Sequence, residues 1–155
     1  MKKILEIGEL VPDLKLPSSE GKEVSLHDFK GKKILLYFYP KDDTPGCTTQ
    51  ACDFRDAQKD FSKLNLEIIG VSKDSLNSHE KFISKYQLPF LLLSDENLEL
   101  MEAFGVWKEK TIYGKTALGI VRSTFLIDED GKLIKEWRNV KATGHVAKVL
   151  EELGK

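Results

Sequence analysis

Two cysteines in one short segment are the side chains of this sequence best suited to chemistry. Cys47 follows Pro45-Gly46, a pair typical of a tight turn, and precedes a stretch with helical periodicity. We therefore expect Cys47 in the first turn of a helix, where free N–H groups and the positive end of the helix dipole stabilise a thiolate. Because the thiolate is the nucleophilic form of cysteine, Cys47 is a candidate nucleophile.

Cys52 lies five residues further along the same predicted helix. Five residues advance an ideal helix by ~7.5 Å and turn it by roughly 140°, so the two thiols point apart and their Cα atoms exceed the ~7 Å limit for a disulfide. If Cys47 and Cys52 do form a disulfide, the first turns of the helix must unwind. The spacing also separates the pair from the Cys-x-x-Cys redox motif. The alternative for Cys52 is inert packing, since free cysteine is often buried.

Two kinds of side chain before Cys47 could complete a site. Thr44 can direct its hydroxyl toward a substrate bound at the thiolate, or it can act only as a turn or cap residue. Pro40 and Pro45 would line the same pocket and limit the access of water. This segment follows a buried strand and precedes a helix, which is where sites form in an open α/β sheet.

Arg122 is a charge at the start of an apolar run, 123–127, and such a charge needs a partner or a role. If this run lies beside the strand predicted for 33–39, the guanidinium can approach the loop before Cys47 and hold the thiolate as an anion. The sequence leaves open an arginine that extends to solvent from the edge of the sheet. Arg55 and Arg138 are competing cations.

Apolar patterns predict the elements that would position these side chains. Continuous apolar runs indicate buried strands, and a 3.6-residue periodicity indicates helices packed on them. Strand–helix alternation indicates an α/β protein of three layers, with a central sheet that is parallel in its middle and has helices on both faces. A C-terminal hairpin makes the sheet mixed. The predicted strands are 14–16 and 23–26 (an N-terminal β-hairpin), 33–39, 66–71, 90–93, 123–127 and 133–137; the predicted helices are 47–64, 75–86, 97–104 and 145–153.

Length and charge limit the possible functions. The 155 residues suit a single domain, 1–155, and 24 Lys plus Arg against 25 Asp plus Glu leave no basic field for nucleic acid. No apolar run approaches the ~18 residues of a membrane span, and Glu6, Glu9 and Asp13 interrupt any signal-peptide core. We therefore expect a cytoplasmic protein that binds no membrane.

The chain offers few ligands for a metal. A zinc site needs about four ligands, and the histidines are scattered without ligand spacing. We expect no metal site. The histidines are His27, His79 and His145.

The pattern Pro40-x-x-x-Thr44-x-x-Cys47 resembles the signature of the peroxiredoxins. The Cys47-x4-Cys52 pair narrows the resemblance to the bacterioferritin comigratory protein, or peroxiredoxin Q, subgroup. The likeness covers nearly the whole chain, from about Gly8 to Leu153. Further segments similar to the subgroup are 54–56, 119–128 and 140–145.

The resemblance implies a thioredoxin-like fold and a thiol-specific peroxidase that reduces hydrogen peroxide and organic hydroperoxides in antioxidant defence, without metal, haem or flavin. By this resemblance Cys47 becomes a sulfenic acid, Cys52 resolves it as an intramolecular disulfide, and thioredoxin or a similar dithiol protein is the reductant. Pro40, Thr44 and Arg122 match the pocket residues of the family. Members of the subgroup are often monomeric, so we expect a monomer.

One position departs from the family pattern. Many members carry Glu where this chain has Gln50. The departure could alter local hydrogen bonding but should not abolish the chemistry.

Two other functions are compatible with the pattern. A general thiol–disulfide oxidoreductase would share the fold, although its cysteines are usually closer together. A non-catalytic binding or holdase domain would keep both thiols structural, but no amphipathic stripe remains unassigned to the sheet.

Overall fold

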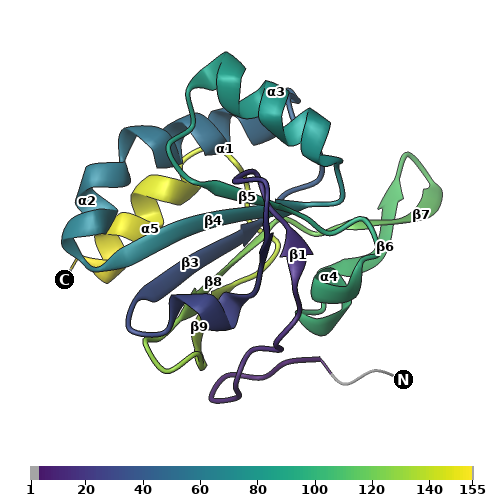
Figure 1. Cartoon of the computed structure of the whole chain (residues 1–155). Helices are drawn as coiled ribbons and strands as arrows, with labels where there is room; N and C mark the ends of the chain where they lie inside the picture. The colour runs from purple at the N-terminus through teal and green to yellow at the C-terminus, as the bar shows by residue number, and fades with distance from the viewer. Residues whose placement is uncertain (1–3, 155) are drawn as a thin grey trace.

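A mixed central sheet forms the middle layer of the computed structural model, which describes residues 4–154 (Figure 1). Its strand order is β5-β4-β3-β8-β9, with β3, β4 and β5 parallel and β8 and β9 antiparallel to their neighbours. The predicted α/β architecture with a mixed sheet is therefore confirmed. The strands are β3 (Lys33–Phe38), β4 (Leu66–Ser72), β5 (Leu91–Ser94), β8 (Ser123–Ile127) and β9 (Leu133–Trp137).

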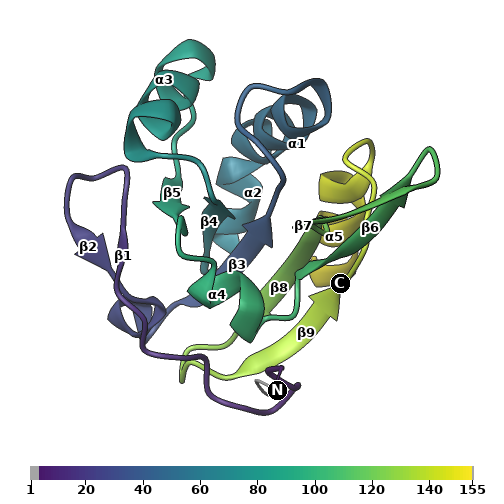
Figure 2. The same cartoon turned by 90° about the vertical axis from the view of Figure 1, so that its right-hand side faces the viewer.

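Helices cover the two faces of this sheet unequally (Figures 1 and 2). Alternate side chains of β3 enter two separate cores, as the two-residue period of a strand requires. Leu35 and Tyr37 face the core beneath α1, α2, α3 and α5, whereas Leu36 and Phe38 face the core beneath α4. The helices are α1 (Pro45–Asp56), α2 (Gln58–Lys63), α3 (Leu76–Tyr86), α4 (Glu99–Ala103) and α5 (His145–Leu153).

The helix predicted as 47–64 is two helices, α1 and α2, so that prediction is wrong in its length. The break falls at Ala57, whose backbone leaves the helical conformation at φ −97° and ψ 4°. Asp53 and Asp56 in the last turn of α1 oppose the helix dipole there, which favours an end at this point. Phe54 and Phe61 still face the core on either side of the break.

Two hairpins lie outside the central sheet. The N-terminal hairpin β1 (Leu16–Pro17) and β2 (Glu23–Val24) is present, as predicted, and a 3₁₀ helix η1 (Leu26–Phe29) follows it. The hairpin β6 (Trp107–Ile112) and β7 (Lys115–Ile120) was not predicted, and it projects from the body of the molecule (Figures 1 and 2). Because Lys115–Leu118 are exposed, this segment carries no apolar face that a sequence pattern could reveal.

Candidate active site

Cys47 lies in the first turn of α1, at the carboxyl end of β3. Thr44 is the N-cap residue and Pro45 the first helical residue, so Cys47 is the third residue of the helix. Its side chain is buried, with 2% exposure, in the core that contains Tyr37 and Phe54. The free N–H groups of the helix start favour the thiolate, whereas the apolar surrounding opposes it, so a reactive Cys47 needs a further positive charge nearby.

Arg122 contacts the sulfur of Cys47. Its Nη2 donates to Cys47 Sγ at 3.3 Å, and its Nη1 donates to Gln50 Oε1 at 2.5 Å. The register of the sheet explains the contact, because Phe38 at the end of β3 pairs with Ser123, which immediately follows Arg122. The guanidinium therefore holds a positive charge against the thiol and is itself held by the second turn of α1.

The start of α1 approaches this guanidinium closely at Gly46. A Cβ on Gly46 would lie 3.2 Å from Arg122 Nη2 and 3.6 Å from the Cβ of Ala142. The first value is tighter than an ordinary van der Waals contact. Gly46 thus serves the close approach of the arginine in addition to the turn.

The competing cations lie elsewhere. Arg55 donates from Nη1 to the carbonyl oxygen of Tyr86, at 2.8 Å, and from Nε to Asp56. Arg138 donates to Glu136 and to the carbonyl oxygen of Phe104. These hydrogen bonds lead to partners other than Cys47.

Thr44 and the prolines take partly different places from those expected. The hydroxyl of Thr44 donates to the carbonyl oxygen of Lys41 at 2.9 Å and makes no cap hydrogen bond to α1. Thr44 and Pro40 are half-buried beside the helix start, whereas Pro45 is exposed. Pro45 therefore shields the thiol from water less than the sequence suggested.

Cys52 lies on the same uninterrupted helix as Cys47. Both cysteines are free thiols, with Cys47 buried and Cys52 half-buried. An ideal helix places residues five apart on different faces, roughly 140° around the axis. A disulfide between them therefore requires α1 to lose its helical conformation.

Sequence reasoning missed two polar groups near Cys47. The Lys110 ammonium, on β6, has its pKa lowered by burial and by the charge of Arg122, whereas Cys47 raises it. Burial and the nearby Cys47 raise the pKa of Tyr37, whose hydroxyl has no hydrogen-bond partner among the described residues. No sequence signal pointed to Lys110, because its strand had not been recognised.

The buried histidines serve structural contacts. His145 is 5% exposed, and its Nε2 lies 2.8 Å from the hydroxyl of Thr124. Burial lowers the pKa of His145 to about 4, and the cations Lys148 and Arg122 contribute to the shift. Within residues 4–154, no cluster of three or more His, Cys, Asp or Glu could hold a metal ion.

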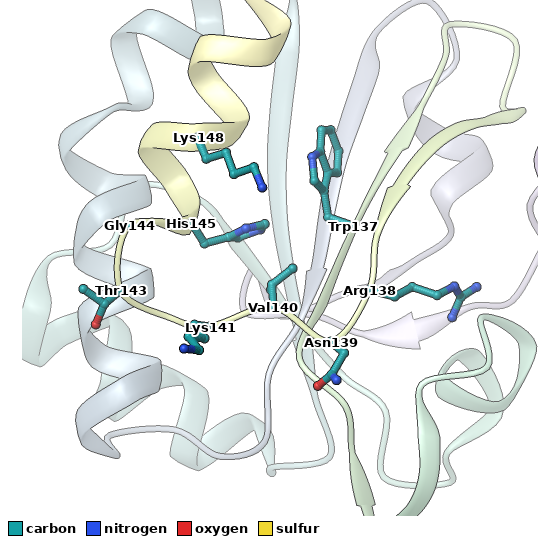
Figure 3. A pocket seen from close by; sticks show the side chains of 9 residues that line it. All are labelled: Trp137, Arg138, Asn139, Val140, Lys141, Thr143, Gly144, His145 and Lys148. Carbon is teal, nitrogen blue, oxygen red and sulfur yellow. The ribbon is translucent and has the colours of Figure 1, made fainter.

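A pocket of 380 Å³ opens beside the site, along the loop between β9 and α5. His145 and Lys148 extend from α5 across it toward Trp137, while Arg138 points away (Figure 3). The loop is joined to the active site, because the N–H of Val140 donates to the carbonyl oxygen of Arg122 at 2.9 Å.

Comparison with known proteins gives the class to which this fold and site belong. Residues 7–136 match the AhpC/TSA family. Peroxiredoxin Bcp of Bacillus subtilis is 58% identical over 149 residues, which cover 96% of this chain and 95% of that protein. The Peroxiredoxin Bcp of Escherichia coli is 44% identical, with 96% of each chain covered.

Solved structures agree. Peroxiredoxin Q of Xanthomonas campestris superposes with a TM-score of 0.89 at 44% identity, over 97% of this chain and 96% of that one. A second structure, of the Bacterioferritin Comigratory Protein of the same organism, concerns its alkyl peroxide reduction activity. It gives a TM-score of 0.89 at 43% identity and covers 99% and 98% of the two chains.

The chain belongs to the AhpC/TSA family of thioredoxin-like peroxide-reducing enzymes. Within that family its relatives are the peroxiredoxins named Bcp or peroxiredoxin Q. The sequence-based prediction of a thiol peroxidase of this subgroup is therefore confirmed.

Proposed function

We propose that this peroxiredoxin reduces hydrogen peroxide and organic hydroperoxides with Cys47 as the attacking thiol and Cys52 as the resolving one. The observation that carries the proposal is the buried Cys47 sulfur at a helix start, 3.3 Å from Arg122 Nη2. The helix start and the guanidinium both favour the thiolate over the thiol. A similar protein whose structure concerns alkyl peroxide reduction supports the same substrate class.

In the first step the Cys47 thiolate attacks one oxygen of the peroxide and the O–O bond breaks. The other oxygen leaves as an alcohol or water after it takes up a proton, and Cys47 becomes a sulfenic acid. Arg122 is placed to stabilise the negative charge that moves from sulfur to the departing oxygen. Thr44 and Pro40, half-buried at the helix start, would border the bound peroxide.

In the second step the Cys52 thiolate attacks the sulfur of Cys47, and the sulfenic oxygen leaves as water. Because both cysteines lie on α1, this step requires the helix to unwind. The break at Ala57 limits how far unwinding must spread, since α2 begins as a separate helix beyond it. A dithiol protein of the thioredoxin type then returns the disulfide to two thiols by exchange.

The remaining features of the proposal concern the setting of the enzyme. We infer one domain over 1–155, a monomer and a cytoplasmic location, without binding to nucleic acid or a membrane. Within residues 4–154, no helix is long and apolar enough to span a membrane. The net charge of −1 gives no support to nucleic-acid binding.

Replacement of each cysteine tests the assignment. In an assay with a thioredoxin system, Cys47→Ser should abolish peroxide-dependent turnover, because the attacking sulfur is gone. Cys52→Ser should still be oxidised at Cys47, but the sulfenic acid should persist and overoxidise readily, and turnover should fall sharply.

Mass spectrometry of the wild type defines the product. One equivalent of peroxide should give a loss of two daltons within one chain, mapped to Cys47–Cys52. Disulfides between chains instead would contradict resolution within one chain, and turnover retained in Cys47→Ser would exclude the whole assignment.

A further inference from the structure

The loop between β3 and α1 carries a carboxylate that the sequence did not mark as unusual. The side chain of Asp42 is 3% exposed. It accepts hydrogen bonds from the Tyr39 hydroxyl at 2.6 Å, from the Ser78 hydroxyl at 2.8 Å and from His79 Nδ1 at 2.7 Å. Such an enclosed carboxylate is tolerated only where donors surround it, as they do here.

His79 is the buried partner of Asp42. The ring is fully buried, and its Nε2 lies 2.9 Å from the carbonyl oxygen of Leu93. A carbonyl oxygen only accepts, so Nε2 carries a hydrogen. Nδ1 lies 2.7 Å from Asp42 Oδ2, an oxygen that also accepts from the Ser78 hydroxyl. Asp42 and His79 therefore form a buried hydrogen-bonded pair.

The pair joins the loop to elements that are not part of α1. His79 and Ser78 belong to α3, and Leu93 belongs to β5. The main-chain N–H of Asp42 adds a further link, because it donates to Asp74 Oδ2 at 2.8 Å. The loop is thus fastened to β5, to α3 and to the segment that precedes α3.

The anchors of the loop do not depend on the helical state of α1. The Thr44 hydroxyl donates back into the loop, to the carbonyl oxygen of Lys41, and makes no side-chain cap bond to the helix. Within residues 4–154, the hydrogen bonds of Asp42 all lead away from α1. Loss of helix from Pro45 onward therefore breaks none of them.

We propose that the hydrogen-bonded pair Asp42–His79 is a positioning element that holds the β3–α1 loop in place while α1 unwinds and refolds. The proposal rests on the roles proposed for Cys47 and Cys52. Asp42 and His79 touch neither sulfur in any recorded contact; they fix the loop that carries Thr44 and delivers Cys47 to Arg122. Cys47 can then return to the same place after each turnover.

Two substitutions of His79 separate this role from simple packing. In His79→Asn the amide nitrogen takes the place of Nδ1 and keeps a donor toward Asp42. In His79→Gln the amide nitrogen takes the place of Nε2 and keeps only the donor toward Leu93. We expect single-turnover oxidation of Cys47 by hydrogen peroxide to slow about tenfold in His79→Gln and less than threefold in His79→Asn.

The neighbouring Asp43 supplies the matched control. Its carboxylate also bonds to α3, at Lys85 and Tyr86, but it is exposed. Asp43→Asn should leave the oxidation rate within twofold of wild type. Equal rates in wild type, His79→Gln and His79→Asn would overturn the positioning role. A wild type that does not react with peroxide would instead contradict the proposed function.

Hydrogen exchange on the wild type tests the same inference without a substitution. Amides of 45–56 should lose protection when the Cys47–Cys52 disulfide forms, whereas the Asp42 amide, bonded to Asp74, should stay protected in both states. Loss of protection at Asp42 together with α1 would show that the loop is not held, and would overturn the proposal.

Discussion

The chain before Cys47 and the chain after it are held by different forces. In the β3–α1 loop, buried polar contacts fasten Asp42 to Tyr39, Ser78 and His79. In α1, apolar packing of Ala51 and Phe54 is combined with hydrogen bonds from two arginines, Arg122 and Arg55. A buried polar network whose members are all hydrogen-bonded rigidifies a structure and specifies one geometry.

The composition of α1 makes its helix easy to unwind. Its sequence, PGCTTQACDFRD, contains few strong helix formers. Thr48 and Thr49 are β-branched, and Asp53 and Asp56 stand near the negative end of the dipole. Burial and the nearby Asp56 also raise the pKa of Asp53.

The difference between the two sides suggests how one site can be both accurate and mobile. The loop holds the geometry in which Cys47 reacts with peroxide. The helix supplies the unwinding that lets Cys52 reach Cys47. A change to the loop or to the helix should therefore affect one of these two properties and leave the other unchanged.

The largest effect is expected for Arg122→Met, which removes the charged contact of the helix side. Oxidation of Cys47 should slow about 10²- to 10³-fold, equivalent to about 3–4 kcal/mol, because a preorganised donor to the reacting atoms is lost. Stopped-flow oxidation by hydrogen peroxide measures the rate. Arg138→Met, an arginine held at Glu136 and Phe104, is the control and should react as the wild type does. A change of less than fivefold in Arg122→Met would argue against the role of this guanidinium.

Mild acid should weaken the helix side. His145, at the start of the helix that packs on α1, is neutral with a pKa of about 4 in the folded state. The unfolded chain binds this proton near pH 6.5, so the contribution of His145 to stability is present above that pH and is lost as the pH falls toward 4. From pH 7.5 to pH 5 the loss is about 2 kcal/mol.

Urea unfolding at the two pH values measures this loss in free energy. His145→Gln cannot be protonated and should show a pH dependence smaller by about the same 2 kcal/mol. Other titrating groups, such as Asp53 and Asp95, remain in both proteins and cancel in the comparison. Identical pH dependence in the two proteins would show that His145 is not the neutral group assigned here.

The position of Cys47 in the fold could be predicted from the sequence, because the residues that determine it are neighbours in the chain. Pro45-Gly46 before Cys47 fixed a helix start, and the apolar runs fixed the buried strands that flank it. Arg122 can approach Cys47 if the strand that follows Arg122 pairs with β3. The register of β3 and β8 shows this pairing. The break at Ala57 carried only the weaker signal of Asp53 and Asp56, since neither Gly nor Pro marks it.

The sequence did not reveal the polar contacts of the β3–α1 loop, because these contacts join residues that are distant in the chain. Asp42 and His79 are 37 residues apart, and each alone reads as an ordinary polar residue. One clue was present: His79 falls on the buried face of α3 with Phe82, where a polar residue needs a partner. The hairpin that carries Lys110 was not predicted for another reason: exposed strands lack the apolar face that a sequence pattern reveals.

The smallest effect is expected for Thr49→Ala, which strengthens the helix side without touching the site. Thr49 is exposed in α1, and alanine favours helix over threonine by ~0.5 kcal/mol. If the disulfide forms only after α1 unwinds, its formation should slow about twofold, because ~0.5 kcal/mol is added to that step. Oxidation of Cys47, which precedes unwinding, should be unchanged.

Rapid acid quench followed by mass spectrometry separates the two steps, and Thr143→Ala, an exposed threonine outside α1, is the matched control. If Thr49→Ala instead slowed the oxidation of Cys47 and left disulfide formation unchanged, unwinding of α1 would not be the step that controls disulfide formation.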